Sequence, residues 1–242
     1  MIEFILVIIS GLALGSFANV LIYRIQEGMS VIKPRSFCPV CKKPIKWYDN
    51  VPVLSYILLN GRCRQCGEKI PVSYLLVEIV TPILFLAVYS GFNDWGQRFV
   101  YAIFVYSMLV ISVIDLQRSV IPDILSLPLI LFGIISSPWT GTGVLQSVIG
   151  AACGIIVFLI MSFAGKRIFK KDALGGGDVK LAGVFGAFLG WEGLLVSVFV
   201  GSLIGTLTSL ALIYVIKKKR WGDYIPFGPF LCAGAFLALF LV

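Results

Sequence analysis

Three aspartates stand beside long apolar runs in a chain that contains no histidine. Asp115 ends one run, Asp123 follows Pro122 near the start of the next, and Asp178 closes the glycine box of residues 175–177 before a third. The lack of histidine excludes Ser-His and Cys-His nucleophilic pairs and the histidine-ligated metalloproteases. Two aspartates that share one proton are an alternative hydrolytic device, because one carboxylate activates water while its protonated partner polarises the scissile carbonyl.

Local structure accounts for the three aspartates to different degrees. Asp123 lies at a helix start, where a carboxylate meets the helix dipole favourably, so a purely structural role stays open for it. Asp178 also precedes a helix, but capping does not require three glycines, which let a backbone or an extended peptide come close. Asp115 lies at a helix C-terminus, the unfavourable end for an acid. We predict that Asp115 and Asp178, 63 residues apart in the sequence, form the catalytic pair once the fold brings them together.

Two CxxC pairs, Cys38-Pro-Val-Cys41 and Cys63-Arg-Gln-Cys66, are separated by 21 residues. Each pair presents two thiolates from a tight turn, and two pairs complete a tetrahedral zinc site. A redox pair or disulfides are the alternatives, but a redox motif needs one CxxC and a cytoplasmic location disfavours disulfides. We predict a structural zinc ion, because four thiolates leave no open position for water. Cys153 and Cys232 lie alone within apolar runs and are expected to be packing residues.

The apolar runs themselves decide the class of protein. The 242 residues are 59% hydrophobic and 13% charged, whereas soluble domains have about 25% charged residues. A membrane-spanning helix needs about 20 apolar residues. The sixth candidate is short and almost joins the seventh at Trp191-Glu192-Gly193, so seven spans are the alternative to eight. The eight candidate spans cover residues 2–23, 74–90, 98–114, 120–137, 143–165, 179–191, 193–216 and 225–242.

The basic residues indicate the orientation of these spans. With the N-terminus outside, segments 24–73, 115–119, 166–178 and 217–224 lie inside, and together with Lys180 they hold 19 of the 20 Lys and Arg residues. This is the asymmetry of the positive-inside rule. The net charge of +8 therefore reflects the orientation of the spans in the membrane. We expect membrane lipid as a partner and no nucleic acid. The first run lacks a basic n-region and is expected to be a retained helix and not a cleaved signal peptide.

The predicted fold is an all-α polytopic membrane protein of about eight transmembrane helices with a small zinc-stabilised cytoplasmic loop domain. We divide it into a first transmembrane helix at 1–23, a cytoplasmic four-cysteine zinc module at 24–73 and a seven-helix membrane protease core at 74–242. The module is too small and polar for a large hydrophobic core, so a bound metal would supply stability.

Five motifs follow one another along the chain. They are Gly15-Ser16-Phe17-Ala18-Asn19-Val20 with Tyr23-Arg24, the double CxxC loop, Asp115 with Ile121-Pro122-Asp123, Gly175-Gly176-Gly177-Asp178 with Val179-Lys180-Leu181, and Pro226-Phe227-Gly228-Pro229-Phe230. Together they resemble the bacterial type IV prepilin peptidases, also called leader peptidase/N-methyltransferases, over nearly the whole chain. The resemblance implies a membrane aspartic protease of the GxGD type in the bacterial cytoplasmic (inner) membrane, with Asp115 and Asp178 as its catalytic pair.

The same resemblance implies a substrate and a second reaction. The substrate would be a prepilin or pseudopilin whose basic leader is cut on the cytoplasmic side after a glycine. The new N-terminus would then be methylated with S-adenosyl-L-methionine, since members that methylate generally carry the four-cysteine loop. Glu78 resembles a motif acid near that loop, so it is a candidate for the transferase or, alternatively, a buried polar residue facing another helix.

Two other classes of protein compete with this interpretation. A transporter could bind cations with its membrane-edge aspartates, but transporters often contain inverted repeats and place acids near the membrane midplane, and we find no convincing repeat. A scaffold with a zinc-stabilised loop and no chemistry would have no use for the glycine box. Both alternatives are less well supported than the peptidase.

Overall fold

The computed structural model describes residues 1–33, 35–169, 175–215 and 225–242. Within these ranges the regular structure is helical, apart from two isolated β-bridges. The predicted all-helical fold is therefore confirmed. Residues 1–110 and 111–242 form two compact units, and the boundary between them falls inside helix α4 (Trp95–Arg118). The predicted division into segments 1–23, 24–73 and 74–242 stays a prediction.

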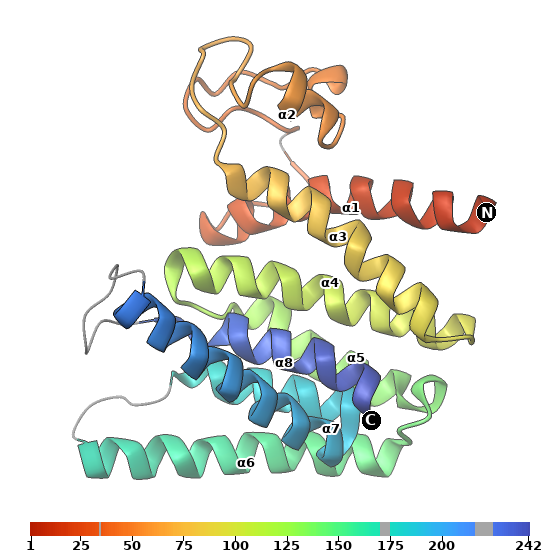
Figure 1. Cartoon of the computed structure of the whole chain (residues 1–242), viewed down its shortest axis with the longest axis vertical. Coiled ribbons are helices and arrows are strands. Elements are labelled where there is room, and N and C mark those ends of the chain that lie inside the picture. Colours follow the sequence, from red (N-terminus) through yellow and green to blue (C-terminus); the bar gives the residue numbers. More distant parts are fainter. Residues whose placement is uncertain (34, 170–174, 216–224) are drawn as a thin grey trace. The chain divides into compact units, whose positions relative to one another are not determined.

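In the first unit, helix α1 (Ile2–Gln26) packs against helix α3 (Val72–Gly91) (Figure 1). Both are long and apolar enough to cross a membrane. The segment that joins them, residues 27–71, is called the cysteine module below. It contains the 3₁₀ helix η1 (Trp47–Asn50) and the short helix α2 (Leu54–Leu58), and is otherwise built of turns and loops.

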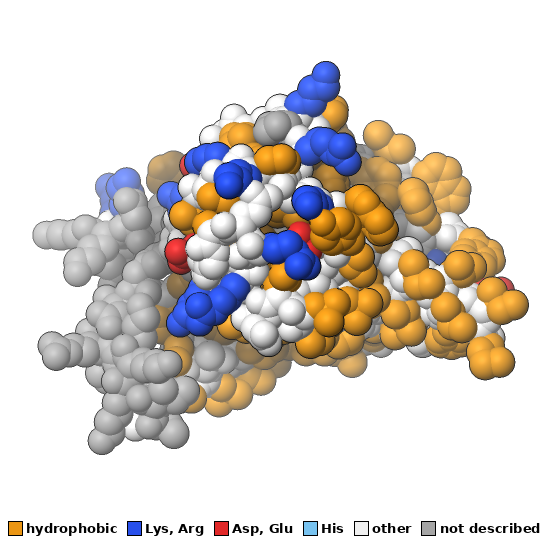
Figure 2. Space-filling view, turned by 90° about the horizontal axis from the view of Figure 1, so that it is seen from above, with side chains coloured by type: hydrophobic (Ala, Val, Ile, Leu, Met, Phe, Trp, Pro, Cys, Tyr) orange, Lys and Arg blue, Asp and Glu red, His pale blue; other side chains and the backbone are white. Residues whose placement is uncertain are grey.

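Hydrogen bonds from buried polar residues of α1 hold the start of the cysteine module and the first turn of α3, which follows it. The Arg24 guanidinium donates to the carbonyl oxygens of Ser30 and Val31 at 3.1 and 2.7 Å, and the Asn19 amide donates to the Tyr74 carbonyl at 3.0 Å. The surface of the module carries basic side chains among scattered apolar ones (Figure 2). These exposed basic residues are Lys33, Arg35, Lys42, Lys43, Lys46, Arg62, Arg64 and Lys69.

In the second unit, helix α7 (Gly176–Leu210) packs against α5 (Asp123–Thr140), α6 (Val144–Phe169) and α8 (Gly228–Leu241). Small residues let these helices approach closely, as is common between helices in membranes. A Cβ atom on Gly186 of α7 would lie 2.1 Å from the Gly150 carbonyl oxygen of α6. Glycine is therefore required at this contact, since no side chain fits there.

Helix α7 is broken at Gly190, whose φ of 69° and ψ of −174° are not helical. The two halves correspond to the sixth and seventh predicted spans, and with them the described residues contain eight apolar helical segments of 14 residues or more. The break lies at Gly190, one residue before the predicted junction Trp191-Glu192-Gly193. Gly190 supplies the turn because only glycine adopts this backbone conformation without strain.

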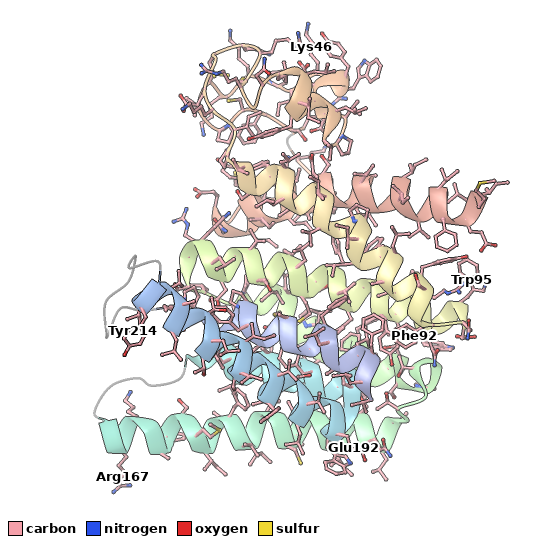
Figure 3. All side chains as sticks on the ribbon, in the orientation of Figure 1. Lys46, Phe92, Trp95, Arg167, Glu192 and Tyr214 are labelled. Carbon is pink, nitrogen blue, oxygen red and sulfur yellow. The ribbon has the colours of Figure 1, made fainter. Side chains whose placement is uncertain are left out.

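The helices have the lengths and surfaces of membrane spans. Six of the described helices are long and apolar enough to cross a membrane, and α8 is a shorter apolar helix. Large apolar side chains such as Phe163 and Phe199 are more than two-thirds exposed, which fits contact with lipid. Arg167 lies in the last turn of α6, and Glu192 lies just after the break at Gly190 in α7 (Figure 3). The protein is therefore a multi-pass membrane protein, while the predicted inner segment 217–224 lies outside the described residues.

Candidate active site and cysteine cluster

The second unit brings the two predicted catalytic aspartates together. Asp115 and Asp178 are only 4% and 8% exposed. Both aspartates lie near the start of α8. A Cβ atom on Gly228 would lie 2.6 Å from Asp115 Oδ2 and 3.5 Å from Leu181, which is one turn after Asp178 in α7. Asp115 lies in the last turns of α4, which extends four residues beyond its predicted end, and Asp178 lies in the first turn of α7. Two buried carboxylates from separate helix ends thus share one polar site.

The start of helix α8 explains how Asp115 is tolerated near the C-terminus of α4. The backbone N–H of Gly228, the first residue of α8, donates to Asp115 Oδ2 at 3.1 Å. This places the positive end of one helix dipole against an acid at the negative end of another. A Cβ atom on Gly228 would lie 2.6 Å from the same carboxylate oxygen. The sequence analysis quoted Gly228 only as part of a motif and gave it no role.

The glycine box holds Asp178 through the backbone. Gly175 is the N-cap of α7, its carbonyl oxygen accepts the Asp178 N–H at 3.1 Å, and a Cβ atom on it would lie 3.4 Å from Asp178 Oδ2. A Cβ atom on Gly177 would lie 2.8 Å from Ile121, whereas one on Gly176 would meet nothing within 4 Å. The middle position of the box is therefore the one where the surroundings leave room for a side chain.

Asp123 stands apart from the buried pair. It is the first residue of α5, its side chain is 60% exposed, and it forms an ion pair with Lys180 of α7. The favourable helix position and this exposed partner account for its presence without a catalytic role.

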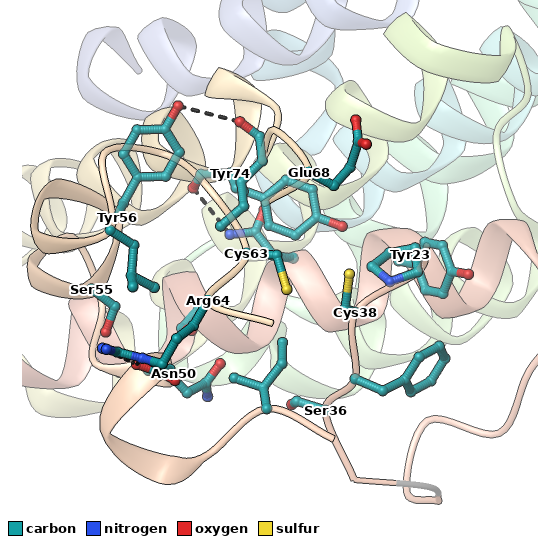
Figure 4. Close-up of a pocket in the computed structure, with 18 of the residues that line it drawn as sticks. Tyr23, Ser36, Cys38, Asn50, Ser55, Tyr56, Cys63, Arg64, Glu68 and Tyr74 are labelled. Atoms are coloured by element: carbon teal, nitrogen blue, oxygen red, sulfur yellow. Dashed lines mark hydrogen bonds and ion pairs between the residues drawn. The ribbon is translucent and has the colours of Figure 1, made fainter. Parts of the chain in front are cut away.

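The first unit brings the four predicted zinc ligands together. The sulfur atoms of Cys38, Cys41, Cys63 and Cys66 all lie within 4.8 Å of one another, and the Cys38 and Cys66 sulfurs are 3.9 Å apart. A tetrahedral zinc site with Zn–S bonds of about 2.3 Å requires sulfur atoms about 3.8 Å apart. The cluster therefore fits a four-thiolate metal ion, and two of its members, Cys38 and Cys63, are seen in Figure 4.

The two CxxC turns have the same backbone geometry. In each, the N–H of the fourth residue after the first cysteine donates to that cysteine's carbonyl, from Lys42 to Cys38 and from Gly67 to Cys63. Both donors have a left-handed φ, 59° for Lys42 and 73° for Gly67. Backbone N–H groups of Gln65 and Cys66 lower the pKa of the Cys63 thiol to about 7, which favours its thiolate form. Burial and the three neighbouring thiols raise the pKa of Cys66 to about 11.

The remaining cysteines and Glu78 have different surroundings. Both cysteines were expected to be packing residues. Cys232 is buried in α8, one turn after Gly228, whereas Cys153 is exposed on α6. The Glu78 carboxylate accepts the Val53 N–H at 2.7 Å. It lies at the wall of a cavity of about 440 Å³ that extends to the cysteine cluster.

Comparisons with known proteins agree with these features. Residues 9–92 match the Bacterial Peptidase A24 N-terminal domain, and residues 102–210 match the Type IV leader peptidase family. The chain is 33% identical over 261 residues to the prepilin leader peptidase/N-methyltransferase of Aeromonas hydrophila, covering 98% of this chain and 90% of that protein. It is 34% identical over 253 residues to the protein of the same name from Vibrio cholerae, covering 98% and 96%.

A similar protein from Myxococcus xanthus, also named prepilin leader peptidase/N-methyltransferase, is 38% identical over 205 residues. That match covers 84% of this chain but 61% of the relative, so the chain spans less than two thirds of that protein's length. No solved structure gives a significant match.

Proposed function

Since the chain belongs to the type IV leader peptidase family, we propose that it removes the basic leader of prepilins or pseudopilins after a glycine. We propose further that it methylates the new N-terminus with S-adenosyl-L-methionine. The observation that carries the peptidase proposal is the burial of Asp115 beside Asp178 in one site. The positive-inside pattern favours cleavage at the cytoplasmic face of the bacterial inner membrane, where a basic leader waits before export.

The two carboxylates supply the proton transfers of peptide hydrolysis. In the reacting state one of them is ionised and takes a proton from water, while the other is protonated and hydrogen-bonds to the scissile carbonyl. The tetrahedral intermediate then collapses as a proton passes to the leaving amine. The Gly228 N–H holds the Asp115 carboxylate, and Gly175 caps the first turn of the helix that carries Asp178, so that the pair is held before substrate binds.

The cysteine cluster has a structural part in this proposal. Cys38, Cys41, Cys63 and Cys66 would hold one zinc ion with no position left for water. Bound metal would stabilise a module in whose described residues the helical structure comprises one 3₁₀ turn and the five residues of α2. Zinc would therefore affect the shape of the module and not the chemistry at the aspartates.

Substitution of the aspartates tests the peptidase proposal. The variants Asp115→Ala and Asp178→Ala, each co-expressed with a prepilin, should leave the leader uncut while the protein still inserts in the membrane. Asp123→Ala is the matched control, because it removes an acid whose side chain is 60% exposed. It should process the prepilin at a rate close to that of the unchanged protein. Normal processing by either of the first two variants would rule out the aspartic mechanism.

A further inference from the structure

The surface of the cysteine module is basic and also exposes large apolar side chains (Figure 2). Its residues 27–71 contain eight Lys and Arg residues but three acids. One of these acids, Asp49, is already paired with Arg64, whose guanidinium donates to both carboxylate oxygens at 2.8 to 3.0 Å. The module therefore carries a net positive charge that attracts anionic surfaces.

Four large apolar side chains stand out from η1 and α2, which pack against each other. Three of them lie on one face of α2 at the i, i+3, i+4 spacing of a helix. On the other face Ser55 is buried, and its hydroxyl donates to the Tyr48 carbonyl at 3.0 Å, which ties α2 to η1. These four side chains, each 59–79% exposed, are called the apolar patch below and are Trp47, Leu54, Ile57 and Leu58.

An open groove of about 330 Å³ is lined partly by the same segment. Its wall includes two cations, Arg35 and Lys46, and two aromatic side chains, Trp47 and Tyr48. The Lys46 ammonium lies 5.6 Å from the centre of the Tyr48 ring. Arg and Lys are the side chains that bind phosphate groups, and Trp and Tyr are enriched where a membrane meets water. The groove therefore matches the headgroup of a phospholipid.

A hydrogen bond places α2 beside the membrane-length helix α3 and not beyond its end. The N–H of Val53, the N-cap of α2, donates to the Glu78 carboxylate at 2.7 Å. Glu78 comes six residues after Val72, the first residue of α3, and this is about 9 Å along the helix axis. The polar layer on each side of a bilayer is about 5–8 Å thick. With α3 starting at the membrane surface, the start of α2 lies near the boundary between headgroups and acyl chains.

We propose that η1 and α2 lie in the surface of the membrane, with the apolar patch among the acyl chains and with Arg35 and Lys46 bound to the phosphate of an anionic phospholipid. Interfacial helices bury their apolar face by about 5–10 Å, which agrees with the contact between Val53 and Glu78. Figure 1 also shows α2 on the side of the module nearer to the N-terminal end of α1, which is the side of the bilayer. The basic leader of the proposed substrate has the same sign of charge as the module, so charge favours lipid as the occupant.

The full chain in lipid nanodiscs tests this docking. The chain contains five tryptophans, so the emission of Trp47 is obtained as the difference between the unchanged protein and Trp47→Phe. The nanodiscs are made of phosphatidylcholine with an increasing fraction of phosphatidylglycerol, and they contain lipid brominated near the headgroup end of its acyl chains, which quenches indole emission on contact. Lys46→Gln removes one charge from the groove. Lys33→Gln is the matched control, because Lys33 is an exposed lysine of the same module that does not line the groove.

Brominated lipid should quench the Trp47 emission, and phosphatidylglycerol should increase the quenching. Lys46→Gln should raise the fraction of phosphatidylglycerol needed for half of this increase about fivefold, the scale of one charge at a membrane surface, whereas Lys33→Gln should change it much less. Circular dichroism of each variant checks that the fold is kept. Trp47 emission that brominated lipid leaves unquenched would overturn the docking of η1 and α2 in the membrane. Equal shifts in Lys46→Gln and Lys33→Gln would overturn the groove as the headgroup site.

Discussion

The substitution Gly228→Ala tests whether a backbone amide sets the place of Asp115. The added Cβ atom would lie 2.6 Å from Asp115 Oδ2, whereas ordinary contacts begin at 3.4 Å. The carboxylate or the start of α8 must therefore move by about 0.8 Å. A displacement of about 1 Å in a catalytic group costs about 100-fold in rate, which corresponds to about 2.7 kcal/mol of transition-state stabilisation. We expect kcat/KM for prepilin cleavage to fall by about that factor.

The control is Gly176→Ala in the glycine box, where a Cβ atom meets nothing within 4 Å. Both variants exchange a helical glycine for alanine, so any gain in helix propensity, about 1 kcal/mol, is common to them. Cleavage of a purified prepilin in detergent and thermal denaturation are measured together. Gly176→Ala should cleave within about threefold of the unchanged protein. Equal rates for Gly228→Ala and the unchanged protein, or an equal loss in Gly176→Ala, would refute the steric reasoning.

Two further predictions concern stability and metal content. Gly186→Ala should lower the free energy of unfolding by about 1–3 kcal/mol, because its Cβ atom would lie 2.1 Å from the Gly150 carbonyl oxygen. The loss is measured as a lower midpoint in thermal denaturation. An unchanged midpoint would contradict the close packing of α6 on α7. The purified chain should contain about one zinc ion by elemental analysis. The quadruple Cys→Ser variant should contain none, and it should lose methylation more than cleavage. Equal zinc content in the variant would exclude the cysteine cluster as the metal site.

The sequence was sufficient for features that depend on local pattern. Apolar length predicted the helices, and CxxC spacing predicted a cluster whose sulfur atoms prove to lie within 4.8 Å of one another. Features that depend on contacts between distant segments could not be predicted. A glycine that breaks a helix, such as Gly190, looks the same in sequence as a glycine that packs, such as Gly186. The Glu78–Val53 contact also joins segments 25 residues apart, so its partner was not visible.

The position of Asp115 shows how backbone groups can hold the proposed catalytic pair. At the end of α4 an acid is unfavourable by itself, and the amide of Gly228, 113 residues later, compensates for it. Any further polar side chain would add to the free-energy cost of burying polar groups at the edge of the membrane. A glycine amide supplies a hydrogen bond and adds no side chain. A peptide substrate would have to lie extended beside the carboxylates for its scissile carbonyl to meet both of them, and small residues let a backbone come close.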